Sequence, residues 1–98
     1  MKFSVEFRPL ASADVAEAFS WYEAQRPGLG REFETNVDRA VVLLGQMAAV
    51  GPVVHRGLRR VLLSHFPFAV YYELIGDVVR IRAVMHTRRH PSTWKRRA

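Results

Sequence analysis

The chain begins with an alternation of apolar and polar residues that predicts a β-strand over residues 2–8. Phe3, Val5 and Phe7 fall on one face, and the residues between them are polar or charged. A period of two is the pattern of a strand with one buried face. Pro9 then interrupts the alternation and suits the first turn of a helix.

Two helices are predicted next, because the spacing of apolar residues changes to three and four. The first spans residues 10–26, with a stripe formed by Val15, Ala18, Phe19 and Tyr22. The second spans about residues 29–49, with a stripe formed by Phe33, Val37, Ala40, Val41, Leu44 and Ala48. Pro27-Gly28 ends the first helix and Gly51-Pro52 ends the second. The short connection between them predicts an antiparallel helical hairpin.

The remaining chain predicts three strands, at residues 58–65, 68–74 and 79–86. Gly76-Asp77 between the last two is a good two-residue hairpin turn. In the last strand, a strict period of two puts Val79, Ile81, Ala83 and Met85 on one face. The same period puts Arg80, Arg82, Val84 and His86 on the other face.

The element order is therefore β-α-α-β-β-β, which predicts an α+β fold in a single domain over residues 1–98. The economical arrangement is an antiparallel sheet with the helical hairpin packed on one face. The other face is then open to solvent or to a partner. If the apolar side of the last strand is the buried one, Arg80, Arg82 and His86 lie on this open face.

Length and composition restrict the class of protein. The chain has 98 residues, of which 49% are hydrophobic, and this is enough for one core. The absence of cysteine excludes a disulfide scaffold, a thiol nucleophile and a cysteine zinc site. The four histidines lack a metal-ligand spacing, so we expect no metal and no cofactor. No apolar run approaches a membrane span and the first residues do not resemble a signal peptide, so we expect a cytoplasmic protein.

The net charge of +6 is unevenly distributed. Residues 1–54 carry five Lys or Arg and seven Asp or Glu, whereas residues 55–98 carry ten and two. The second half is therefore +8. Such a one-sided field attracts polyanions, either nucleic acid or an acidic protein segment. The alternative is a solvated basic surface without a specific partner.

The basic half also contains groups that could cleave RNA. In such a site, Arg60 and Arg82 would bind a phosphate, while Glu73 and His86 would move protons. Simpler roles exist for each of them. Glu73 could pair with an arginine across the strands, the arginines could be a solvated face, and His86 could have a binding role. Trp94 could either stack on a base or pack under the sheet.

Five segments occur in an order and at a spacing that together are specific. They are Phe7-Arg8-Pro9, residues 21–30 (WYEAQRPGLG), residues 57–60 (GLRR), residues 66–72 (FPFAVYY) and residues 79–89 (VRIRAVMHTRR). In this combination the chain resembles the RelE/ParE superfamily, the toxins of type II toxin–antitoxin modules, which include plasmid stabilisation proteins. The resemblance covers nearly the whole chain, and the fold of that family has the element order predicted above.

The resemblance implies a toxin that arrests growth and is neutralised by a cognate antitoxin from an adjacent gene, in a hetero-oligomer. On this basis, the residues that would bind the antitoxin are Trp21, Tyr22, Leu29, Arg59, Arg60 and Arg82. The residues that would bind the target are Arg80, Arg82, His86, Arg88, Arg89 and Trp94.

The family contains two kinds of toxin. ParE-like members inhibit DNA gyrase, whereas RelE-like members are mRNA endonucleases that act on the ribosome. The chain lacks the lysine-rich patch of the RelE branch, and residues 86–89 are more similar to the ParE branch, although His90 stands where that branch usually has an acid. We therefore favour a gyrase inhibitor that is not an enzyme. The first alternative is a ribonuclease that uses Arg60, Glu73, Arg82 and His86. The second alternative is a non-toxic module that binds nucleic acid.

Overall fold

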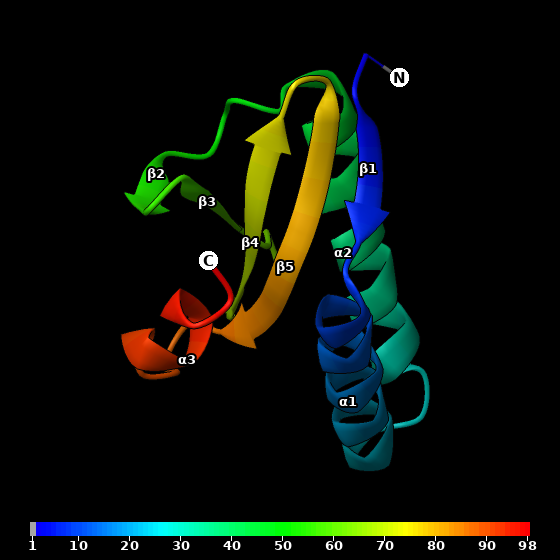
Figure 1. Ribbon diagram of the computed structural model, residues 1–98. Coiled ribbons are helices and arrows are strands. Elements are labelled where there is room, and N and C mark those ends of the chain that lie inside the picture. The colour runs from blue at the N-terminus through cyan, green and yellow to red at the C-terminus, as the bar shows by residue number, and fades with distance from the viewer. Residues whose placement is uncertain (1) are drawn as a thin grey trace.

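The computed structural model describes residues 2–98 and shows a five-stranded sheet with two long helices on one face (Figure 1). The elements are β1 (Ser4–Phe7), α1 (Pro9–Gln25), α2 (Leu29–Gln46), β2 (Val53–His55), β3 (Leu58–Leu62), β4 (Phe68–Ile75), β5 (Val78–His86) and α3 (Pro91–Lys95). The strand order is β1-β5-β4-β3-β2. The α+β class and the helical hairpin are confirmed. The short elements β2 and α3 were not predicted.

One edge of the sheet differs from the expectation of a wholly antiparallel arrangement. β1 runs parallel to β5, with Ser4 opposite Val78 and Phe7 opposite Ile81. The other pairings are antiparallel. The hairpin with β4 makes β5 antiparallel to β4. β1 comes from the other end of the sequence and adds to the free edge of β5 in the parallel direction. The sheet is therefore mixed.

A β-bulge in β5 interrupts the alternation of its side chains. Tyr71 of β4 lies opposite Ala83 and Tyr72 lies opposite Ile81, so Arg82 is an extra residue on β5. A bulge of this kind shifts the phase of the residues that follow it. The prediction from a strict period of two is consequently wrong beyond this point.

The bulge moves His86 to the helical face of the sheet. Val84 packs into the core beneath the helices, whereas Met85 faces away from them. His86, two residues after Val84, lies on the same face as Val84. The expectation that His86 shares the open face with Arg80 and Arg82 is therefore wrong.

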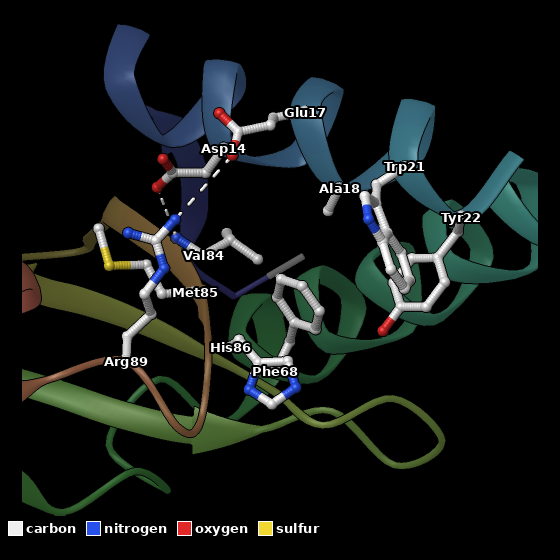
Figure 2. Close-up of a pocket in the computed structure, with 10 residues that line it drawn as sticks. All are labelled: Asp14, Glu17, Ala18, Trp21, Tyr22, Phe68, Val84, Met85, His86 and Arg89. Carbon is white, nitrogen blue, oxygen red and sulfur yellow. Dashed lines mark hydrogen bonds and ion pairs between the residues drawn. The ribbon is translucent and has the colours of Figure 1, made fainter. Parts of the chain in front are cut away.

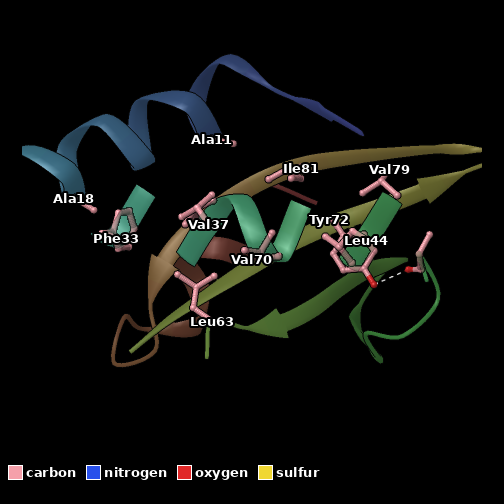
Figure 3. Close-up of a cluster of buried hydrophobic side chains, with 13 residues drawn as sticks. Ala11, Ala18, Phe33, Val37, Leu44, Leu63, Val70, Tyr72, Val79 and Ile81 are labelled. Atoms are coloured by element: carbon pink, nitrogen blue, oxygen red, sulfur yellow. Dashed lines mark hydrogen bonds between the residues drawn. The ribbon is translucent and has the colours of Figure 1, made fainter. Parts of the chain in front are cut away.

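The main core lies between the helical hairpin and the sheet (Figure 3). Its buried residues are Ala11, Ala18, Phe33, Val37, Ala40, Leu44, Ala48, Leu63, Val70, Tyr72, Val79, Ile81 and Val84. The stripes predicted for both helices contribute to this core, except that Phe19 of the first stripe is only half-buried and is not part of the cluster. Burial of a side chain such as Phe33 or Leu44 contributes about 1.5–3 kcal/mol.

The opposite face of the sheet is partly covered by α3 and is not fully open. Trp94 of α3 is only 7% exposed and stacks on Tyr71, with ring centroids 4.7 Å apart. The other buried residues of this second cluster are Leu58, Ala69, Ala83 and Met85. Trp94 therefore packs under the sheet, which leaves little of its ring exposed for the predicted contact with a target.

The connection between the two helices explains much of the pattern in residues 21–30. The carboxylate of Glu23 accepts from the backbone N–H groups of Gly28 and Gly30, at 2.9 and 3.0 Å, and so caps the N-terminus of α2. Gly28 has a φ of 90°. A Cβ on Gly30 would lie 2.7 Å from the carbonyl oxygen of Phe19. Gly30 therefore permits the close approach of the helices, whereas Gly28 permits the left-handed backbone conformation between them.

Tyr72 joins the sheet to the segment that follows α2. Its buried hydroxyl donates to the carbonyl of Ala48 at 2.6 Å and accepts from the N–H of Gly51 at 3.0 Å. Burial raises the pKa of Tyr72, although the Gly51 N–H and nearby Arg59 act in the opposite direction. The hydroxyl therefore keeps its proton and can donate at neutral pH.

Replacing Tyr72 with Phe should destabilise the protein, because both backbone groups lose their side-chain partner. We expect a loss of about 1–3 kcal/mol in the free energy of unfolding, measured by urea denaturation. Tyr71→Phe is the matched control, since it removes the same atom from a neighbouring buried ring that instead stacks on Trp94. Equal losses in the two variants would contradict this role of the Tyr72 hydroxyl.

Candidate functional site

An exposed basic surface surrounds the end of β5 and α3. Its residues are Arg88, Arg89, Lys95 and Arg96, and all four are exposed. Arg89 lies 3.9 Å from Glu17, but both side chains are largely in solvent, so this ion pair contributes little. The surface therefore presents positive charge to polyanions or acidic segments.

Two predicted site arginines are instead paired within the sheet. Arg82 donates to Glu73 at 2.7 Å, and Arg80 donates to Glu6 at the same distance. The Arg82–Glu73 pair is partly buried, with about a quarter of each side chain exposed. Cross-strand pairing is therefore the structural role of Glu73.

The candidate catalytic residues do not form a single site. Arg60, Glu73 and Arg82 lie on the face of the sheet that carries α3, with the Arg60 guanidinium over the ring of Tyr71. His86 lies on the face that carries α1 and lines a cavity there. The sheet therefore separates the imidazole from the carboxylate.

The cavity lined by His86 lies between α1 and the end of β5 and has a volume of about 440 Å³ (Figure 2). Figure 2 shows Trp21 and Tyr22 of α1 on one side, with Phe68 and His86 nearby on the strands. His86 Nδ1 accepts from the backbone N–H of Arg88 at 3.0 Å, which leaves the ring proton on Nε2 in the neutral state.

The aromatic wall of this cavity is well packed. Tyr22 contacts the rings of Phe33, Phe66 and Phe68. Burial raises the pKa of Tyr22, so its hydroxyl stays neutral at physiological pH. Trp21, in contrast, is 60% exposed and touches Tyr22 edge-on, with ring centroids 5.2 Å apart. The wall thus combines the packed ring of Tyr22 with the solvent-facing ring of Trp21.

The six residues expected to bind an antitoxin do not share one surface. Trp21 and Tyr22 line the cavity, and Leu29 is half-buried at the start of α2. Arg59 donates to the backbone carbonyl of Gly51 at 2.8 Å. Arg60 and Arg82 lie on the face of the sheet that carries α3. A partner that contacts all six would have to wrap around the sheet.

Asp14 of α1 is an important residue that the sequence analysis missed. Its carboxylate accepts from the backbone N–H of Val84 at 3.0 Å and from two nitrogens of Arg97 at 2.9 and 3.1 Å. Arg97 also donates to the carbonyl of Arg82 at 2.9 Å. Both charged side chains are less than a fifth exposed. Arg97 is therefore a structural residue, separate from the exposed basic surface.

The site shows no arrangement for a metal. Within residues 2–98, no group of three or more His, Asp or Glu side chains could hold a metal ion. Across the same range, none of the helices has the length and apolar character needed to cross a membrane.

Comparison with known proteins identifies the family. The model for the ParE toxin of the type II toxin–antitoxin system parDE matches residues 5–91. The chain belongs to the ParE toxin family. It is accordingly a toxin of a type II toxin–antitoxin system, and the ParE branch favoured from the sequence is confirmed. A search of curated proteins gave no match.

Solved structures agree with this family in fold. A chain from the chromosomal ParDE TA system from P. aeruginosa has a TM-score of 0.77 and 21% sequence identity to this ParE-family chain. The match covers 87% of this chain and 96% of that chain. At this low identity the likeness concerns the fold.

The role of Asp14 can be tested by Asp14→Ala. The change should lower the free energy of unfolding by about 3 kcal/mol, because Arg97 loses a partly buried partner and Val84 N–H loses its acceptor. Glu17→Ala is the matched control, since it removes an exposed carboxylate from the same helix and should cost less than about 0.5 kcal/mol. Urea denaturation measures both. Similar losses would contradict the special role of Asp14.

Proposed function

We propose that this ParE-family toxin acts by binding and inhibiting DNA gyrase, and that it does not cleave RNA. The observation that carries the proposal is the position of His86, across the sheet from Glu73 and Arg82. Acid–base cleavage of RNA needs proton-transferring groups within hydrogen-bond reach of one phosphate. Glu73 is also engaged by Arg82 at 2.7 Å. These features favour inhibition by binding.

The exposed basic surface of Arg88, Arg89, Lys95 and Arg96 is the proposed contact with the target. Gyrase at work holds DNA, and DNA carries a dense negative charge. Exposed arginines can form paired hydrogen bonds with phosphate or carboxylate groups of such a complex. Because gyrase acts on the chromosome, the proposal also implies a cytoplasmic location.

The purified toxin should inhibit plasmid supercoiling by gyrase, and the variant Arg88→Glu/Arg89→Glu should be at least tenfold weaker. Reversal of two charges at the contact replaces attraction with repulsion. Arg8→Glu/Arg56→Glu is the control, since it reverses two exposed arginines elsewhere and should retain inhibition. His86→Ala should also retain inhibition and toxicity.

The RelE-like alternative makes the opposite prediction for His86. It requires codon-linked mRNA cleavage on translating ribosomes, with a large loss of cleavage in His86→Ala. That result, combined with normal gyrase supercoiling in the presence of the toxin, would overturn the proposal.

The cavity beside α1 supports neutralisation by an antitoxin in a hetero-oligomer. Its aromatic wall includes Trp21, which is 60% exposed, and its volume of about 440 Å³ can admit a large apolar side chain. Aromatic residues in such pockets often dominate the binding energy of an interface. An antitoxin segment that fills the cavity would remove Trp21 from water.

Trp21→Ala should weaken binding of the antitoxin encoded by the adjacent gene at least tenfold, as measured by calorimetry. Leu10→Ala is the control, because Leu10 is equally exposed on the same helix but does not line the cavity. Gyrase inhibition by the free toxin should be unchanged in both variants. Unchanged antitoxin affinity in Trp21→Ala would contradict the docking site.

A further inference from the structure

A second groove, of about 370 Å³, lies between α2 and the turn that joins β3 to β4. Arg31, Thr35 and Arg39 of α2 line it, together with His65 of the turn. The three α2 residues follow one another at a spacing of four, so they lie along one ridge of the helix. The Cα atoms of Arg31 and Arg39 are about 12 Å apart along the axis, and long side chains can converge from both ends.

The floor of the groove contains Asn36, a polar residue that is only 4% exposed. The backbone N–H of His65 donates to Asn36 Oδ1 at 3.1 Å, and Asn36 Nδ2 donates to Ser64 Oγ at 2.7 Å. Because a backbone N–H can only donate, the first contact determines which amide atom is oxygen. A buried amide is thus used to hold His65 beside α2.

The same hydrogen bonds determine which ring nitrogen of His65 carries the proton. Ser64 Oγ accepts from Asn36 and lies 2.8 Å from His65 Nδ1. Donation of the hydroxyl proton to Nδ1 completes this chain of hydrogen bonds and leaves the imidazole proton on Nε2. His65 then offers an N–H donor at the groove. A bound anion would strengthen this preference, because it favours a donor at Nε2.

The charged residues of the groove favour an anion. Glu32 also lines it, but its carboxylate accepts from Arg26 at 2.9 Å. The exposed guanidinium groups of Arg31 and Arg39 are hydrogen-bond donors, and so is the ring Nε2–H of His65. The hydroxyl of Thr35 can donate as well. Guanidinium groups bind phosphate oxygens through two parallel N–H bonds.

We propose that this groove is a phosphate-binding site, separate from the basic surface around α3 and from the cavity beside α1. A tetrahedral phosphate offers oxygen acceptors in several directions, which matches donors that approach from a helix and from a facing turn. The phosphate could belong to a free diphosphate compound or to the backbone of DNA, since both present the same oxygens. This site does not depend on gyrase inhibition.

Titration of the toxin with pyrophosphate, followed by NMR at constant ionic strength, tests the proposal. The backbone signals of Thr35 and His65 should shift and saturate. Arg31→Gln/Arg39→Gln should weaken this binding at least tenfold, because two charge-assisted contacts are lost. Arg8→Gln/Arg56→Gln removes the same charge from other exposed positions and should bind as the unmodified chain does. Thermal unfolding verifies that both variants are folded.

A short DNA duplex distinguishes the two sources of phosphate. If the duplex shifts the same signals and is displaced by pyrophosphate, the DNA backbone is the ligand. If pyrophosphate shifts them and the duplex does not, a free diphosphate compound is the ligand. Shifts that do not saturate, or equal losses in the two double variants, would show diffuse charge attraction and overturn the proposal. Gyrase inhibition is measured separately and does not enter this test.

Discussion

The contact between the Asp14 carboxylate and its three hydrogen-bond donors holds α1, the end of β5 and the segment after α3 together. Pairing between β1 and β5 ends at Phe7 and Ile81, and α1 then takes the place of a strand beside β5. The carboxylate of Asp14 satisfies Val84 N–H at this junction and also binds Arg97. One side chain therefore positions α1 against the end of β5 and fastens the segment after α3 to both. Asp14 and Val84 themselves line the cavity beside α1, and Arg97 follows α3, which carries part of the exposed basic surface.

Much of the fold could be predicted because each main element has a local pattern. The stripe from Phe33 to Leu44 and the turn at Gly76-Asp77 depend on near neighbours along the chain. The bulge at Arg82 has no such signal, since Val84 and Met85 are both apolar and either could face the core. The parallel pairing of β1 was missed for a similar reason, because it joins the two ends of the chain.

In the candidate site, the location of the charge could be predicted from the sequence, but the partner of each arginine could not. A count of arginines correctly located the positive charge in the second half of the chain, but it treated those arginines as equivalent. The structure separates Arg97, which is held by Asp14, and Arg82, which is held by Glu73, from the exposed pair Arg88 and Arg89. These partners lie far away in sequence, so only the folded chain identifies the arginines that remain accessible.

Arg89 belongs both to the lining of the cavity beside α1 and to the exposed basic surface. A protein that fills the cavity would therefore touch one of the side chains proposed to meet the target. The two partners would compete for the same few atoms, and occupancy by one would exclude the other without any change in the shape of the toxin. Under the proposed function, the place of Arg89 in both surfaces makes neutralisation a matter of simple steric exclusion.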